Sequence, residues 1–278
     1  MAGNQDILFQ VEDRVATIAL NRPDKHNALT YAMMEEIGAL FGEIRERDDI
    51  SVVIVKGNGP SFAAGHDLTD WRPEAPYAVR EKFASEQRRV LEHGTRWRAM
   101  MWDLPQPIIG QVQGYCLTSG LELAMNCDLI YAATDAQFAM RSIGGSGRYY
   151  HLWPWTVGVR RSKELMFTGR YVSGDEAARI GMVNGAVPVD DLDAHVLNLA
   201  RQISKVPLAW LALDKQACNK ALDLMGAREG QEYAAIMHAA SHLTEESVAM
   251  DEKLKSSAWR DAVRERDERY AQPLRSDV

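Results

Sequence analysis

Residues 108–132 read IIGQVQGYCLTSGLELAMNCDLIYA, and this stretch decides the fold class. We expect a strand over Ile108 to Val112, a loop over Gly114 to Ser119 and a helix from about Gly120. Leu129 to Ala132 follow as a further short apolar strand. Because strand, loop and helix alternate, the order predicts parallel strands with helices outside them. Functional groups are then expected in the loops at the C-terminal ends of the strands.

The same plan occurs closer to the N-terminus. Ile7 to Val11 and Val15 to Leu20 are rich in β-forming residues and predict a hairpin. Thr30 can cap a helix over Tyr31 to Arg47, whose apolar residues recur at helical spacing. Ser51 to Lys56 is an apolar run rich in β-branched residues, and it predicts a buried strand that leads into a loop.

Helical patterns flank the central stretch and dominate the C-terminal part. Tyr77 to Trp102 read as helical, Gln137 to Met140 read as a further β-like run, and from Ser162 the chain is largely helical. We therefore expect an α/β core over residues 1–200 and a C-terminal helical region over residues 201–278, typical of a lid or a subunit contact. The helices of that region are expected at residues 207–225, 229–241 and 245–270.

Composition excludes several classes of function. The 278 residues carry a formal net charge of -7, so the chain lacks the net basic field that nucleic acid or an anionic membrane favours. No apolar run has the length of a membrane-spanning helix. The three cysteines, Cys116, Cys127 and Cys218, have no metal-ligand spacing and are expected to be buried. We predict no metal and a reducing, cytoplasmic location, although an organellar protein without its transit peptide would give the same pattern.

Two loops combine small residues with the start of a helix. One runs from Ser61 to Leu68 and the other from Gly114 to Glu122. Small residues let the backbone approach a ligand closely, and the first turn of a helix directs unpaired N–H groups toward it. Two such groups that converge on one oxygen form an oxyanion hole. Each donor aimed at developing charge contributes about 2.7–4 kcal/mol.

Four motifs in register resemble the crotonase family, also called enoyl-CoA hydratase/isomerase. They are NRPDKHNAL at residues 21–29, FAAGHDL at 62–68, GYCLTSGLELAMNCDLIYA at 114–132 and ELMFTGRYVSGDEAARIGMVNGAV at 164–187. The resemblance implies an α/β fold built as a spiral of ββα turns. It also implies an acyl-CoA substrate, no permanently bound cofactor, and assembly as a homotrimer or homohexamer.

The resemblance also implies roles for individual residues. The backbone N–H groups of His66 and Ser119 would be the two oxyanion donors, although the family usually has glycine where this chain has Ser119. Lys25 is placed to approach the phosphates of CoA. Contacts to adenine and pantetheine would fall on the backbone of Ala63, Ala64, Asp67 and Leu68.

The carboxylates do not determine which reaction this chain would catalyse. Hydratases of this family use two glutamates, and Glu122 matches the first, whereas Ser142 stands where the second is expected. One carboxylate moves one proton, but hydration needs both activation of water and protonation of carbon. Tyr150 and His151 offer replacement acids or bases. Hydration or isomerisation, decarboxylation, hydrolytic C–C cleavage and a catalytically silent CoA-binding or scaffold protein therefore all stay open.

Two acidic residues also have structural interpretations. Glu122 would favour the first turn of its helix even without a catalytic role, because acids are stabilised there. Asp128 stands at a junction between helix and strand, and we expect it to bind backbone donors rather than to act in catalysis.

Overall fold

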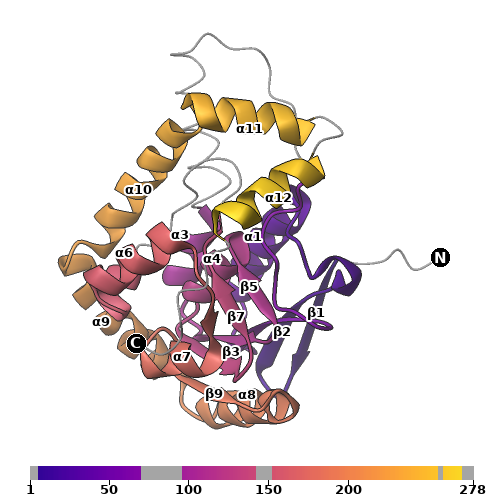
Figure 1. Cartoon of the computed structure of the whole chain (residues 1–278). Helices are drawn as coiled ribbons and strands as arrows, with labels where there is room; N and C mark the ends of the chain where they lie inside the picture. Colours follow the sequence, from indigo (N-terminus) through magenta and orange to yellow (C-terminus); the bar gives the residue numbers. More distant parts are fainter. Residues whose placement is uncertain (1–5, 70–95, 142–151, 256–258, 271–278) are drawn as a thin grey trace.

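The computed structural model describes residues 6–69, 96–141, 152–255 and 259–270. Within them the strands form a six-stranded sheet of order β1-β2-β3-β4-β6-β9 and a three-stranded sheet of order β5-β7-β8 (Figure 1). The strands of the larger sheet are β1 Ile7–Glu12, β2 Val15–Leu20, β3 Val52–Gly57, β4 Ile108–Val112, β6 Leu129–Ala133 and β9 Gly185–Val187. Those of the smaller sheet are β5 Tyr115–Leu117, β7 Gln137–Ala139 and β8 Val172–Ser173.

Helices cover the sheets and build the C-terminal part. In Figure 1, α9 and α10 run up one side of the molecule and α11 lies across its top. The first group of helices is η1 Pro23–Lys25, α1 Tyr31–Arg45, α3 Arg96–Trp102, α4 Ser119–Met125, α5 Trp153–Thr156 and α6 Val159–Thr168. The second is α7 Gly174–Arg179, α8 Val189–Ile203, α9 Leu208–Leu224, α10 Ala227–Ser241, α11 Glu245–Lys255 and α12 Trp259–Arg269.

The larger sheet confirms the predicted parallel strands. β2, β3, β4, β6 and β9 pair in parallel, and only β1 is antiparallel, to β2, through the predicted hairpin. β4 is buried along its whole length, and β3 is buried except at Lys56. Strands covered on both faces have this pattern.

Helix α1 follows its predicted pattern closely. The Thr30 side chain accepts a hydrogen bond from the backbone N–H of Met33, which satisfies one of the unpaired donors of the first turn. The helix buries the apolar positions Met33, Met34, Ile37, Phe41 and Ile44. It ends at Arg45, two residues before the predicted end.

The smaller sheet corrects the prediction of a continuous loop over residues 114–119. Tyr115–Leu117 form β5, which pairs in parallel with β7, and β7 pairs antiparallel with β8. Three residues are too few to show a strand period, so this short element depends on partners that lie far along the chain.

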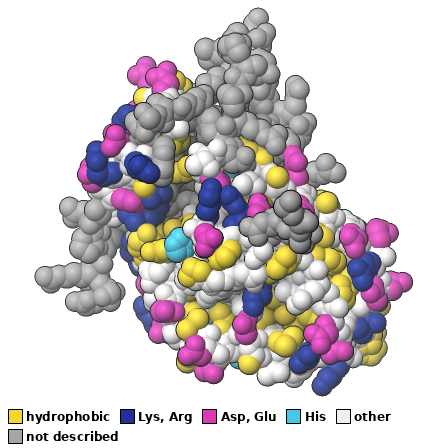
Figure 2. Space-filling model, turned by 90° about the vertical axis from the view of Figure 1, so that its right-hand side faces the viewer, with side chains coloured by type: hydrophobic (Ala, Val, Ile, Leu, Met, Phe, Trp, Pro, Cys, Tyr) yellow, Lys and Arg dark blue, Asp and Glu magenta, His cyan; other side chains and the backbone are white. Residues whose placement is uncertain are grey.

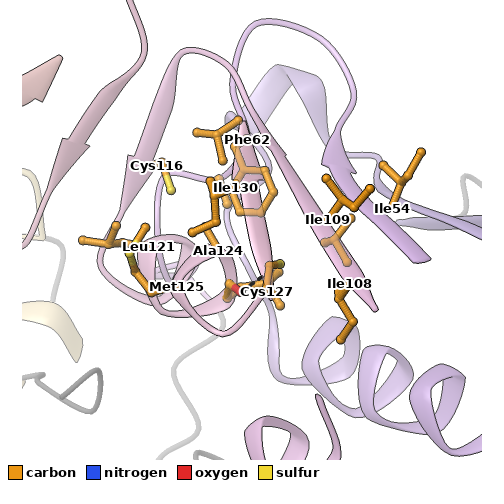
Figure 3. Packing of buried hydrophobic residues seen from close by; sticks show 14 of the residues in the cluster. Ile54, Phe62, Ile108, Ile109, Cys116, Leu121, Ala124, Met125, Cys127 and Ile130 are labelled. Atoms are coloured by element: carbon orange, nitrogen blue, oxygen red, sulfur yellow. Dashed lines mark hydrogen bonds between the residues drawn. The ribbon is translucent and has the colours of Figure 1, made fainter. Parts of the chain in front are cut away.

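Helix α4 lies wholly inside the protein. All its residues from Ser119 to Met125 are buried. Figure 3 shows Leu121, Ala124 and Met125 of this helix in the apolar cluster that also contains Cys116 and Phe62. A helix that is buried on every face is held by its surroundings rather than by an exposed polar side, so the start of α4 is rigidly placed.

The cysteines only partly follow the prediction. Cys116 and Cys127 are buried, but Cys218 on α9 is exposed, so the expectation of burial was wrong for Cys218. Burial raises the pKa of the Cys116 thiol well above its usual value. Burial, with a smaller contribution from the neighbouring Asp128, also raises the pKa of the Cys127 thiol. These two thiols are therefore neutral packing groups.

The stretch 245–270 folds as two helices that lie against each other. The side chains of Lys253 on α11 and Glu265 on α12 form an ion pair of 2.7 Å. In one continuous helix, positions twelve apart would be separated by about 18 Å. The chain therefore reverses between α11 and α12, and the prediction of one helical stretch was wrong.

The described surface mixes charges of both signs. Figure 2 shows basic and acidic side chains interspersed with apolar ones on one face of the molecule. A field of a single sign does not arise from such an arrangement. No helix among the described residues is long and apolar enough to cross a membrane.

Candidate active site

The two loops singled out in the sequence lie side by side. Ala63 of the first loop and Cys116 on β5 form a parallel bridge. The Ala63 N–H donates to the Tyr115 carbonyl at 2.9 Å, and the Leu117 N–H donates to the Ala63 carbonyl at 2.9 Å. The first loop thus runs parallel to β5 and to the segment that leads into α4.

Glycines let the loops come into direct contact. Gly65 has φ of +106°, and a Cβ added there would lie 2.0 Å from Oγ1 of Thr118. A Cβ added at Gly120 would lie 2.6 Å from both the Cβ and the carbonyl oxygen of Ala63. Neither position has room for a side chain, so the close approach of the two loops requires glycine at both places.

The backbone of His66 is oriented by Leu29. The Leu29 N–H donates to the Gly65 carbonyl at 2.7 Å, and the Asp67 N–H donates to the Leu29 carbonyl at 2.9 Å. In such a parallel bridge, the residue between the two bonded neighbours directs its own N–H and C=O toward the opposite edge. The N–H and C=O of His66 therefore point away from Leu29. The imidazole is exposed, and its ring lies 6.3 Å from that of Tyr31 in a stacked arrangement.

The second loop is strained immediately before α4. Thr118 has φ of 45° and ψ of -114°, a conformation that β-branched residues rarely adopt. Backbone strain of this kind costs about 1–3 kcal/mol and clusters at functional sites. Ser119 begins α4 and is only 3% exposed, and its Oγ has no hydrogen-bond partner among the described residues.

Glu122 pairs with an arginine from another helix. Nη2 of Arg98 on α3 donates to Oε2 of Glu122. Both side chains are almost completely buried, with 4% and 5% of their surfaces exposed. Sequence reasoning missed Arg98, because it lies in a stretch whose helical register could not be assigned. One of several arginines in such a stretch gives no signal of its own.

Buried and charged side chains hold the first loop in place. Nδ2 of Asn27 donates to the carbonyls of Asn58 and Ser61 at 2.9 and 2.7 Å, and Asn27 is fully buried. The Asp67 carboxylate accepts from Nη2 of Arg22 at 2.8 Å and from Oγ1 of Thr69 at 2.6 Å. The motif at residues 21–29 therefore fixes the position of the loop that carries His66. The role of Asn27 was also missed.

The pKa of Asp67 reflects these contacts. Partial burial raises it, but the hydrogen bonds from Thr69 and Arg22 and the nearby charge of Lys25 outweigh burial and lower the pKa to about 2. Nζ of Lys25 lies 3.6 Å from Oδ2 of Asp67, and the Lys25 side chain is 54% exposed. Lys25 is therefore the accessible cation of this cluster.

The remaining residues implied for CoA lie on the same loop. Ala63 is buried, whereas Ala64 and Leu68 are partly exposed. The N–H groups of Ala63, Ala64 and Asp67 already donate to Tyr115, His26 and Leu29. Leu68 packs against the small apolar cluster formed by Met250, Leu254 and Ala262, which brings α11 and α12 next to the loop.

Two candidate residues and the position of the missing glutamate fall outside the described residues. Tyr150 and His151 lie there, as does Ser142. Within the described residues, no group of three or more His, Cys, Asp and Glu side chains could hold a metal ion.

Asp128 has the structural contacts that its position predicts. Its Oδ2 accepts the backbone N–H of Ile108 at 2.7 Å and lies 2.8 Å from Nζ of Lys215 on α9. Lys215 is buried and also donates to the carbonyls of Met101 and Gln106. This ion pair connects the sheet to the C-terminal helices. Its contacts given above do not involve the two paired loops.

The parallel sheet and the paired loops define an α/β protein of the crotonase class, as the sequence motifs indicated. Residues 10–262 match the family profile described as Enoyl-CoA hydratase/isomerase. The chain belongs to this family.

Individual relatives agree with this assignment. The chain is 31% identical over 227 residues to the short-chain-enoyl-CoA hydratase of Clostridium acetobutylicum, covering 78% of this chain and 82% of that protein. A crystal structure of a probable enoyl-CoA hydratase from Mycobacterium thermoresistibile is 38% identical, with a TM-score of 0.77 over 85% of this chain and 94% of that one. An enoyl-CoA hydratase from Mycobacterium smegmatis is 29% identical, with a TM-score of 0.85 over 99% and 98% of the two chains.

Proposed function

We propose that this chain is an acyl-CoA enzyme that stabilises a thioester enolate between the backbone N–H groups of His66 and Ser119. The register of the two loops carries the proposal. Ala63 pairs with Cys116, Gly65 touches Thr118, and the next residues along the two parallel segments are His66 and Ser119. Donors already in place where charge develops need no reorganisation during the reaction.

Glu122 is the proposed proton-transfer residue. It stands one helical turn after Ser119 and is buried, so water competes little for its carboxylate. We propose a reaction of the hydratase or isomerase type. Because Ser142 stands where a second glutamate is expected, decarboxylation or hydrolytic C–C cleavage within the same family is the alternative, with Tyr150 or His151 as the added acid or base.

CoA is proposed to enter as part of the substrate, without a permanently bound cofactor. Since the N–H groups of Ala63, Ala64 and Asp67 are used within the protein and Ala63 is buried, contacts from this loop to CoA would come from carbonyl oxygens such as that of the partly exposed Ala64. Carbonyls suit the amino group of adenine, which is a donor. Lys25, the accessible cation beside the loop, would meet the phosphates, so Lys25→Ala should raise KM for acyl-CoA but not for acyl-pantetheine.

A homotrimer or homohexamer is the proposed assembly. Large apolar side chains are exposed on the outer helices α6, α9 and α10, and a contact between subunits would remove such side chains from water. They include Phe167, Trp210, Leu213, Leu224 and Tyr233, which are 63–78% exposed. Light scattering of the purified protein tests this proposal, and a monomer at micromolar concentration would contradict it.

The oxyanion hole is tested by removing one N–H. Ser119→Pro deletes the proposed donor at the first position of a helix, where proline is tolerated, whereas Ser119→Ala keeps the donor and removes only the hydroxyl. We expect kcat to fall about 100- to 1,000-fold in the proline variant and to stay near wild type in the alanine variant. The proline variant should also lose any preference for a bound thioester over the matching thioether.

The type of reaction is tested by product mass. The protein is incubated with crotonyl-CoA, a malonyl-type CoA and a cyclic β-keto acyl-CoA, and Glu122→Gln serves as the inactive reference. Addition of water, loss of carbon dioxide and hydrolytic ring opening give three different mass changes. Turnover of none of these thioesters, together with retained acyl-CoA binding, would favour the catalytically silent binding protein.

A further inference from the structure

A buried arginine contacts the proposed proton-transfer residue. Arg98 comes from α3 and Glu122 from α4, so the two charges come from separate helices. Nη2 of Arg98 donates to Oε2 of Glu122, and about one twentieth of each side chain is exposed. The mechanism proposed above uses Glu122 but assigns nothing to Arg98.

Burial and the permanent charge of arginine determine whether Glu122 is ionised in the Arg98–Glu122 pair. A carboxylate removed from water strongly favours its protonated form unless a positive charge compensates for the lost hydration. An arginine side chain does not lose its proton in proteins, so it supplies that charge at every accessible pH. Its planar guanidinium also fixes the direction from which the carboxylate is approached.

We propose that Arg98 is a positioning residue that keeps Glu122 ionised and oriented, so that Glu122 begins the reaction as a base that accepts a proton from carbon. This inference rests on the proposed function. The C–H bond next to the thioester, or at the end of a conjugated system, breaks and its proton moves to the Glu122 carboxylate. The electron pair moves to the thioester oxygen held by the two N–H groups. Glu122 later returns the proton to carbon, so no oxidant, reductant or further reactant is needed.

The other titratable groups on the elements next to α4 are neutral, exposed or paired with another residue. On β5, Cys116 is a buried neutral thiol and Tyr115 is 40% exposed. After α4, Cys127 is also a buried neutral thiol, and Asp128 is paired with Lys215.

On the first loop, Asp67 is paired with Arg22, and the His66 imidazole is exposed beside Tyr31. On β4 there is no titratable side chain. Among the described residues of these elements, Arg98 is thus the cation that contacts Glu122 directly.

The first test measures exchange of substrate hydrogen for deuterium as a function of pH. A non-reacting saturated acyl-CoA is incubated in deuterated buffer, and exchange is followed by mass. In Arg98→Gln we expect a lower rate, a KM close to wild type, and an acid limb of the rate profile moved upward by about 1–3 pH units. Arg98→Lys keeps the charge and should restore most of the wild-type profile.

A matched control separates this effect from general damage to the fold. Arg170→Gln breaks another ion pair, formed with Glu176 at 2.8 Å on α7. It should leave the acid limb of the profile unmoved. If Arg98→Gln, measured as a folded protein, behaves like Arg170→Gln, the inference is overturned.

The second test needs no substrate and therefore distinguishes the inference from the proposed function. Glutamate labelled with carbon-13 at its carboxyl is titrated by NMR, and the Glu122 resonance is identified by its loss in Glu122→Gln. The resonance should titrate at higher pH in Arg98→Gln than in wild type. Equal titration in the two proteins overturns the inference, whereas a shifted titration without any acyl-CoA binding refutes only the proposed function.

Two further variants cover the case in which Arg98→Gln does not fold. If the single variant does not fold, the titration is carried out with Arg98→Lys, in which a Glu122 carboxylate that is ionised at neutral pH supports the inference and one that is protonated at neutral pH overturns it. Arg98→Met combined with Glu122→Gln removes both charges and should fold, because loss of a buried pair as a whole is tolerated better than loss of one partner.

Discussion

Substitution of Gly120 by alanine tests the close approach of the two loops. The added Cβ would lie 2.6 Å from the Cβ and from the carbonyl oxygen of Ala63, and neither atom belongs to a flexible side chain. Overpacking costs about 1–3 kcal/mol. The higher helix propensity of alanine offsets about 1 kcal/mol of that cost. We therefore expect a small net loss of stability but a large loss of activity, because the first loop must move away from α4 together with His66.

Gly38→Ala is the matched control for this prediction. It makes the same change within α1, where the added Cβ meets only Cβ of Trp97 at 3.8 Å. Denaturant unfolding should show Gly120→Ala less stable than Gly38→Ala by about 1–3 kcal/mol. Acyl-CoA turnover should fall about 100-fold or more in Gly120→Ala alone, as expected when an oxyanion donor is displaced. Equal stability and equal turnover of the two variants would refute the steric argument.

Three further outcomes are expected. Lys215→Met should destabilise the protein by about 3–5 kcal/mol in denaturant unfolding because it leaves Asp128 without its buried cation, and adding Asp128→Asn should recover part of that loss. The pKa of Asp67 is lowered to about 2, so its contribution to stability is complete above the unfolded value near 3.9 and is lost as pH falls toward 2; acid titration should show this loss in wild type but not in Asp67→Asn. Under native conditions a thiol reagent should modify Cys218 alone, and unfolding should expose the two buried cysteines; rapid native modification of all three would contradict the packing.

Long-range contacts explain what sequence reasoning missed at the site. Arg98 meets Glu122 only because folding brings α3 and α4 within reach of each other, and no spacing in the sequence indicates that contact. Asn27 gives a similar case, since its amide binds carbonyls that are more than thirty residues away. Both residues are polar and buried, and sequence patterns predict burial well for apolar residues but not for polar ones that find a partner.

Local order was readable from the sequence alone. The β1–β2 hairpin, the capped helix α1, the buried strands β3 and β4 and the start of α4 all depend on residues that are neighbours along the chain, so period and capping residues predict them. The motifs also placed the chain in its family.

Only the tertiary structure decided how distant segments meet. The three residues of β5, the reversal between α11 and α12, the exposure of Cys218 and the Arg98–Glu122 ion pair depend on partners brought together by folding. What stabilises these features is the burial and pairing of residues throughout the core, and not any local sequence preference. A short stretch of sequence specifies its own backbone preference, but not which of many distant surfaces will cover it.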